Sequence, residues 1–126
     1  MQYRANEWKD PKLASQIRIR EAEGTWVVRA GGAVLGESKK ALELSENGYP
    51  GRIYFPREDI AMDFLDSSDT STICPHKGEA SYFSIATKST TIKDAVWSYA
   101  SPIDAAARIA GLLCFYESDQ VTVEQL

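Results

Sequence analysis

The most chemically active part of the chain is the turn-like segment CPHKGEASY, at residues 74–82. It gathers a thiol (Cys74), an imidazole (His76), an ammonium (Lys77) and a carboxylate (Glu79), and its histidine is the only one in the chain. Cys74 is a candidate nucleophile, because neighbouring cations favour the thiolate over the neutral thiol. The alternative is a structural, half-buried cysteine that leads into a proline-containing turn.

The same segment and a later aromatic stretch predict a binding site for a small polar molecule. Lys77, expected to lie on the surface, would anchor a polar group of the ligand. Glu79 would orient Lys77 or accept a proton. His76 is assigned to ligand binding together with three aromatic side chains whose polar tips suit a pocket wall: Tyr82, Trp97 and Tyr99. The alternative is a solvated Lys/Glu pair beside aromatics that only pack a sheet.

The inventory of possible ligands argues against a metal centre. A zinc site would need Cys74, His76, Cys114 and a carboxylate from distant segments, because the chain has one histidine and no C-x-x-C motif. Cys114 lies between two apolar residues and is expected to be a small core hydrophobe. Phosphate-binding glycine loops and the nucleophile elbow are absent from the sequence, so no cofactor is expected.

Composition indicates one soluble domain over residues 1–126, with an N-terminal arm at 1–14 and a body at 15–126. A hydrophobic content of 44% in 126 residues is enough for a core without disulfides or metals. The net charge of -4 makes nucleic acid a poor partner. No apolar run suits a membrane span or a secretory signal, and two widely spaced cysteines fit a reducing cytoplasm.

Short β-branched and aromatic runs between turn residues predict many strands. Before residue 65 these are a hairpin of 17–20 with 25–30, a third strand at 33–35 after Gly31-Gly32, and a strand at 52–55. Residues 41–44 fit a strand or a helical turn, and 59–64 a single helical turn. Later segments are a polar loop at 66–72, a hairpin of 79–87 with 90–98, and terminal strands at 112–117 and 120–124.

One helix is predicted at residues 102–111, with Ser101 as its N-cap, Pro102 at its first position and Gly111 after its end. One helix among many short strands predicts a mainly β fold. The expected architecture is a small antiparallel β-barrel or a tent-like folded sheet.

Several motifs carry a family resemblance through their order and spacing. They are Tyr54-Phe55-Pro56 with Asp59, the CPHKGEASY segment, Trp97-Ser98-Tyr99 with Pro102, and Ile109-Ala110-Gly111 with Phe115-Tyr116. Over roughly residues 17–124 the chain resembles a bacterial family known as domain of unknown function 427, or DUF427. The resemblance implies a tent-like β fold, as in methionine sulfoxide reductase B and related zinc-binding folds, and no established reaction. The family commonly has tyrosine where this chain has His76, so a mechanism based on that imidazole would not serve the whole family.

The sequence thus predicts a cytoplasmic domain that binds a small polar molecule near residues 74–82, with catalysis left open. The alternative is a non-catalytic structural or interaction module. In that case an exposed strand edge or an aromatic patch would form a homodimer or bind another protein.

Overall fold

The computed structural model describes residues 17–46 and 49–126, and the predicted arm at 1–14 lies outside them. The described residues form ten strands and three short 3-10 helices. The strands are β1 (Arg18–Glu21), β2 (Trp26–Ala30), β3 (Ala33–Ser38), β4 (Leu42–Glu46), β5 (Tyr49–Phe55), β6 (Leu65–Cys74), β7 (Gly78–Ala86), β8 (Thr91–Ser98), β9 (Leu113–Phe115) and β10 (Val121–Gln125). The 3-10 helices are η2 (Arg57–Asp59), η3 (Met62–Phe64) and η4 (Asp104–Ile109).

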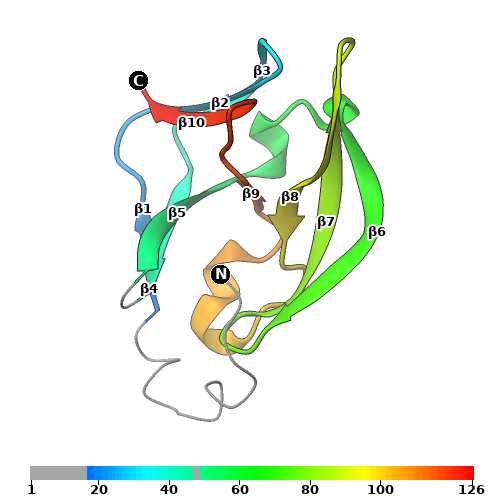
Figure 1. The fold of residues 1–126 in the computed structure, drawn as a ribbon. Coiled ribbons are helices and arrows are strands. Elements are labelled where there is room, and N and C mark those ends of the chain that lie inside the picture. The colour runs from blue at the N-terminus through cyan, green and yellow to red at the C-terminus, as the bar shows by residue number, and fades with distance from the viewer. Residues whose placement is uncertain (1–16, 47–48) are drawn as a thin grey trace.

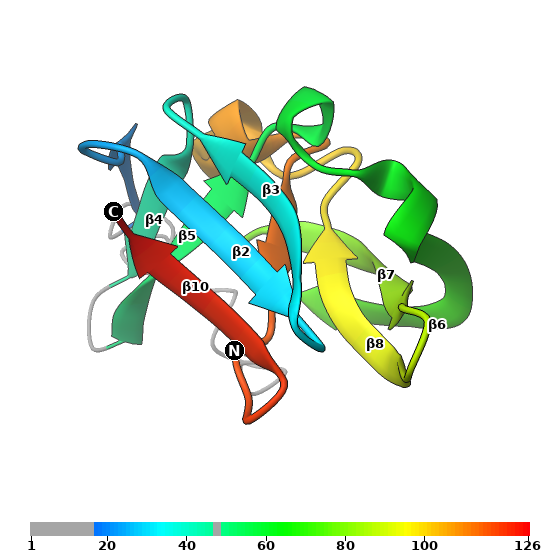
Figure 2. The ribbon, with the colours of Figure 1, turned by 90° about the horizontal axis from the view of Figure 1, so that it is seen from above.

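The strands form two antiparallel sheets, which confirms a mainly β fold. The larger sheet has seven strands in the order β1-β4-β5-β9-β8-β7-β6, and the smaller has three in the order β10-β2-β3. The larger sheet is strongly curved: β4 and β5 lie on one side in Figure 1, β6 and β7 on the other, and η4 between them. The smaller sheet lies across one end (Figure 2). The outer strands of the larger sheet, β1 and β6, do not pair, so of the two predicted architectures the closed barrel is wrong.

The predicted α-helix at 102–111 is also wrong. Asp104–Ile109 forms 3-10 turns, interrupted at Ala106 by a non-helical backbone (φ -114°, ψ 16°). Two of its residues, Ala106 and Ile109, are buried, and the Gly111 amide donates to the Tyr99 carbonyl at 2.9 Å. An α-helix this short is marginal in water, so the packing of the return from β8 to β9 outweighs the alanine propensity.

Strand pairing differs from the sequence prediction at the N-terminal side. The predicted hairpin of 17–20 with 25–30 is wrong, because β1 pairs with β4 whereas β2 pairs with β3 and β10. Gly24, with a φ of +79°, lies where the chain leaves one sheet for the other. Such a backbone is accessible mainly to glycine. The turn at Gly31-Gly32 does join β2 to β3, as predicted.

The predicted polar loop at 66–72 is instead the middle of β6, an edge strand paired with β7. Its serines and threonines need no apolar partner, because one edge of the strand remains outside the sheet. The hairpin of β7 with β8 is confirmed, and the undecided segment at 41–44 contributes to β4. The predicted terminal strands exist as β9 and β10, although they lie in different sheets.

Two buried clusters lie on opposite faces of the larger sheet. The inter-sheet core, between the two sheets, consists of Val28, Ala30, Leu35, Phe55, Ile60, Ile85, Ala95, Val96, Leu113, Phe115 and Val121. The aromatic cluster, on the concave face, consists of Leu44, Tyr54, Cys74, Ala80, Tyr82, Trp97, Tyr99, Ala106, Ile109 and Cys114. Adjacent residues such as Tyr54 and Phe55 enter different clusters because side chains alternate along a strand. No helix among the described residues is long and apolar enough to span a membrane.

Candidate functional site

The predicted site segment forms the tight connection between β6 and β7. The Lys77 amide donates to the Cys74 carbonyl at 3.1 Å, and the Lys77 carbonyl accepts from the Ile103 amide at 2.8 Å. Gly78 has a φ of +116°, and a Cβ there would meet Pro102 Cα at 3.4 Å. The turn is therefore held against the segment that precedes η4, and the positive φ of Gly78 favours glycine there.

Lys77 is fully buried, with 0% exposure, so the expectation of a surface lysine is wrong. Its Nζ forms an ion pair with Glu46 Oε1 and lies 6.0 Å from the centre of the Tyr99 ring. The ammonium thus faces both a carboxylate and the π face of an aromatic ring, two interactions that favour a cation.

Glu46 is the site residue that the sequence prediction missed. Its side chain is only 4% exposed; Oε1 pairs with Lys77, and Oε2 lies 3.9 Å from His76 Nδ1. Among the hydrogen bonds of the described residues, none reaches Oε2. The available signal was alternation: Glu46 follows Leu42 and Leu44 at intervals of two, on the buried face of β4.

Four of the seven predicted site residues belong to the aromatic cluster: Cys74, Tyr82, Trp97 and Tyr99. Lys77 and His76 are both buried, and both face the carboxylate of Glu46. Lys77 also lies beside Tyr99 of the cluster. Glu79 is exposed on β7, and the carboxylate that pairs with Lys77 is that of Glu46. The structure therefore brings six of the predicted residues to one region.

The aromatic side chains form a connected wall that reaches the surface. Trp97 Nε1 donates to Tyr54 Oη at 3.1 Å, and the Trp97 ring lies 4.3 Å from that of Tyr116, measured between centroids. Tyr116 is 39% exposed. Burial, with a hydrogen bond to Tyr82, raises the pKa of Tyr116 to about 12. The Tyr116 phenol therefore stays neutral at physiological pH and acts as a hydrogen-bonding group.

Both cysteines are buried free thiols in the aromatic cluster. Burial raises the pKa of the Cys114 thiol, which favours the neutral form of a small core residue. Cys74 has 0% exposure, so a reagent cannot reach its sulfur without local opening. Within the described ranges, no group of three or more His, Cys, Asp or Glu side chains is arranged to hold a metal ion.

Comparison with models of known protein families shows which family this chain belongs to. A family model described as a domain of unknown function, DUF427, matches residues 18–125. The chain belongs to the DUF427 family. The match confirms the resemblance predicted from the motifs. No curated protein matches the chain. Both sheets of the DUF427 domain, the buried ion pair and the aromatic cluster all lie within the matched range.

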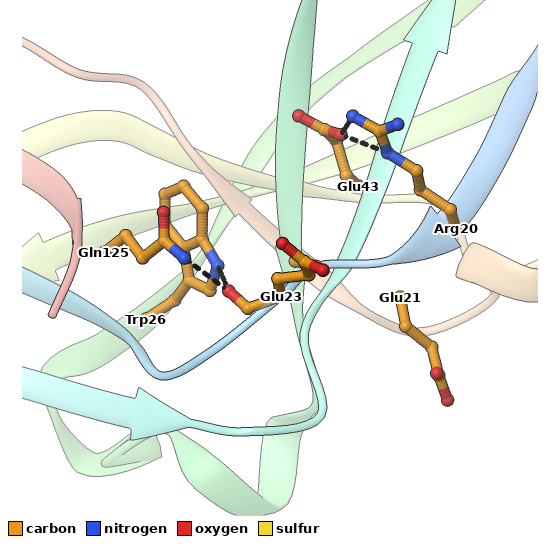
Figure 3. A pocket seen from close by; sticks show the side chains of 7 residues that line it. Arg20, Glu21, Glu23, Trp26, Glu43 and Gln125 are labelled. Atoms are coloured by element: carbon orange, nitrogen blue, oxygen red, sulfur yellow. Dashed lines mark hydrogen bonds and ion pairs between the residues drawn. The ribbon is translucent and has the colours of Figure 1, made fainter.

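The DUF427 domain also has an open pocket on the other side of the larger sheet. It has a volume of about 540 Å³, and Figure 3 shows six of its lining side chains: Arg20, Glu21, Glu23, Trp26, Glu43 and Gln125. A smaller hollow of about 180 Å³ shares Trp26 and Glu43 with it. We call the two hollows together the inter-sheet groove. None of the residues predicted as a site lines it.

Proposed function

We propose that this DUF427 domain binds a small polar molecule at the buried carboxylate of Glu46, beside Lys77, His76 and the aromatic cluster. One observation carries the proposal: Glu46 is buried, yet its Oε2 accepts no hydrogen bond from the described residues. Buried polar atoms are almost always satisfied, so an unsatisfied one calls for a donor from elsewhere. A ligand with an N–H or O–H group would supply that donor.

The energetic cost of the ion pair supports a functional reading. Desolvation of two charges costs several kcal/mol per ion, and apolar side chains of similar size are often at least as stabilising. A fold that needed only packing here would gain little from Lys77 and Glu46. Buried charges beside titratable and aromatic groups are instead typical of functional sites. The phenols of Tyr82 and Tyr99 would line the site, and Cys74 stays a candidate nucleophile if the bound molecule is a substrate.

Entry of the ligand requires a local opening, because Lys77 and Trp97 are buried. The half-exposed ring of Tyr116 on Trp97 marks the side from which the cluster is accessible. The apparent affinity is reduced by the fraction of molecules that are open at any moment. We therefore expect slow association, in line with other sites that are competent only in a minor state.

A second candidate function rests on where the ion pair lies in the fold. Glu46 ends β4, near one edge of the larger sheet, whereas Lys77 lies in the β6–β7 turn at its other edge. The pair would then be a structural clasp within a protein-interaction module or homodimer that takes no small molecule. The free cysteines fit the cytoplasmic location proposed for either function.

A thermal-shift screen of the full chain with nucleotides, amino acids and sugar phosphates separates the two functions. A ligand present at 100 times its dissociation constant adds about 2.7 kcal/mol to stability. The matched control is the double variant Glu46→Met/Lys77→Met, which removes both charges together and keeps the side-chain volume. Binding predicts a double variant that folds as stably as the wild type but responds to no ligand. A wild type that responds to none of these compounds, with a less stable double variant, would favour the clasp.

A further inference from the structure

The inter-sheet groove lies where the two sheets separate at one end of the molecule. The lining of its larger hollow comes from β1 and β4 of the larger sheet, from β2 and β10 of the smaller sheet, and from the β1–β2 connection (Figure 3). Ile53 and Phe115 line the smaller hollow together with Arg52 and Cys114, and Cys114 is also a member of the aromatic cluster. In the larger hollow, Glu43 is the strand neighbour of Leu44, a member of the aromatic cluster, so this hollow and the buried ion pair lie on opposite faces of the larger sheet.

Trp26 forms a fixed aromatic wall at the centre of the groove. Its Nε1 donates to the main-chain carbonyl of Glu23 at 2.9 Å, and Gln125 Nε2 donates to the same oxygen at 2.8 Å. The half-buried ring also packs against the inter-sheet core. A ring fixed at its polar edge and by its packing offers a binding surface whose ordering is complete before a ligand arrives.

The charges of the larger hollow favour a cation. Arg20 is the cation of the larger hollow, and Glu43 neutralises it, with Arg20 Nε 2.7 Å from Glu43 Oε1. Glu21 and Glu23 form no ion pair within the part of the chain that the structure describes. Figure 3 shows the Glu23 carboxylate between Trp26 and the Arg20–Glu43 pair, whereas that of Glu21 points away from them. Glu23 thus leaves an unneutralised negative charge beside the indole ring.

The smaller hollow adds an apolar surface next to this charge. Ile53, Phe115 and Val123 line it beside the charged Arg52 and Glu117, and it shares Trp26 and Glu43 with the larger hollow. A molecule that spans both would place an apolar body against these residues and a cationic head near Glu23 and Trp26. Indole rings attract such heads through their π faces.

We infer that the inter-sheet groove binds a small organic cation, an alkyl chain that carries an ammonium or guanidinium head. The head lies between the Glu23 carboxylate and the Trp26 ring, and the chain lies along Ile53 and Val123. This site is separate from the proposed site at Glu46, and neither depends on the other.

Titration of the full chain with n-butylammonium, followed through the indole N–H signals in heteronuclear NMR spectra, tests the inference. The Trp26→Phe variant assigns the signal of Trp26. We expect this signal to shift to saturation with n-butylammonium and with agmatine. The isosteric alcohol n-butanol and the anion butyrate should leave it unchanged. Binding should weaken at high salt, because the carboxylate is exposed.

The decisive variant is Glu23→Gln, which removes the carboxylate but keeps the main-chain carbonyl that fixes Trp26. We expect it to bind n-butylammonium about three- to tenfold more weakly. Glu21→Gln is the matched control, because it removes the same charge from a side chain that points away, and its affinity should change less than about twofold. Equal binding of n-butanol, or a Glu23→Gln variant as tight as the wild type, would overturn the inference.

Discussion

Lys77 and Glu46 form a buried ion pair between the two ends of the larger sheet, although 31 positions separate them in the chain. Glu46 ends β4, and Lys77 lies in the turn from β6 to β7. The sheet order places β4 second from one edge and β6 at the other. The curvature of the sheet therefore brings its two ends into contact through side chains, although no backbone pairing closes a barrel.

This pair predicts an asymmetric response to substitution. Lys77→Met leaves the Glu46 carboxylate buried without its cation, and we expect the free energy of unfolding to fall by about 3–5 kcal/mol. Urea denaturation measures the effect. Lys40→Met is the control, because Lys40 pairs with Glu58 at the surface, where an ion pair contributes about 0–1 kcal/mol. A Lys77→Met protein as stable as the double variant Glu46→Met/Lys77→Met would contradict this account.

The burial of the two thiols predicts their reactivity. We expect neither Cys74 nor Cys114 to react with an alkylating agent at pH 8 in the folded protein, and both to react once urea unfolds it. Mass spectrometry counts the modified thiols, and a Cys114→Ala background isolates Cys74. Alkylation of folded Cys74 at the rate of a free thiol would instead show an accessible sulfur and strengthen its candidacy as a nucleophile.

The close approach of β3 to the segment after β5 predicts a cost at Gly36. A Cβ there would lie 2.3 Å from the Asp59 carbonyl oxygen and 2.6 Å from Ile60 Cδ1. Because backbone blocks the new methyl group, we expect Gly36→Ala to lower the free energy of unfolding by about 1–3 kcal/mol.

Gly51→Ala is the matched control for Gly36→Ala, and urea denaturation measures both. At Gly51 the nearest atom to a new Cβ is Glu43 Oε2 at 2.8 Å, the far end of a flexible side chain. That side chain can move aside, so the cost should be smaller. Equal losses in the two variants would mean that the contact at Asp59 relaxes easily.

The sequence predicted the strands better than their partners. Alternation and turn residues identified β2, β3, β7 and β8, because these signals are local. The partner of β1 could not be read in this way, since β1 pairs with β4 across two intervening strands. The polar β6 was missed because an edge strand need not carry the apolar alternation of a strand with two neighbours.

The candidate site was predicted in its members but not in its environment. The motif identified Lys77 and Tyr99, which do lie together. Lys77 was expected to lie on the surface, and its pairing with Glu79 was expected because the two residues are close in the sequence. The true partner, Glu46, comes from a distant strand, so only the curvature of the sheet determines that Lys77 is buried. The inter-sheet groove left no local signal, because the residues of its larger hollow alone come from four separate strands and one connection.

The link between β8 and the edge strand β6 predicts an acid-sensitive contribution to stability. Asp94 accepts hydrogen bonds from Ser68 Oγ at 2.5 Å and from Thr70 Oγ1 at 2.7 Å. These two hydrogen bonds lower the pKa of the Asp94 carboxyl from its ordinary value of 3.8, and the bond from Ser68 has the larger effect. A carboxyl with a lower pKa in the folded state adds stability above its unfolded pKa and loses it as the pH falls through the folded value.

The variant Asp94→Asn tests this dependence, because asparagine tolerates the φ of +51° at this position but does not titrate. We expect it to be less stable than the wild type at pH 7, with the difference shrinking as the pH falls below about 4. The midpoint of urea unfolding, measured from pH 7 to pH 3, gives both curves. Replacing the donors, as in Ser68→Ala/Thr70→Val, should produce the same convergence. A stability difference that stays constant over this range would mean that these hydrogen bonds do not favour the ionised carboxylate, and that Asp94 acts through its backbone conformation alone.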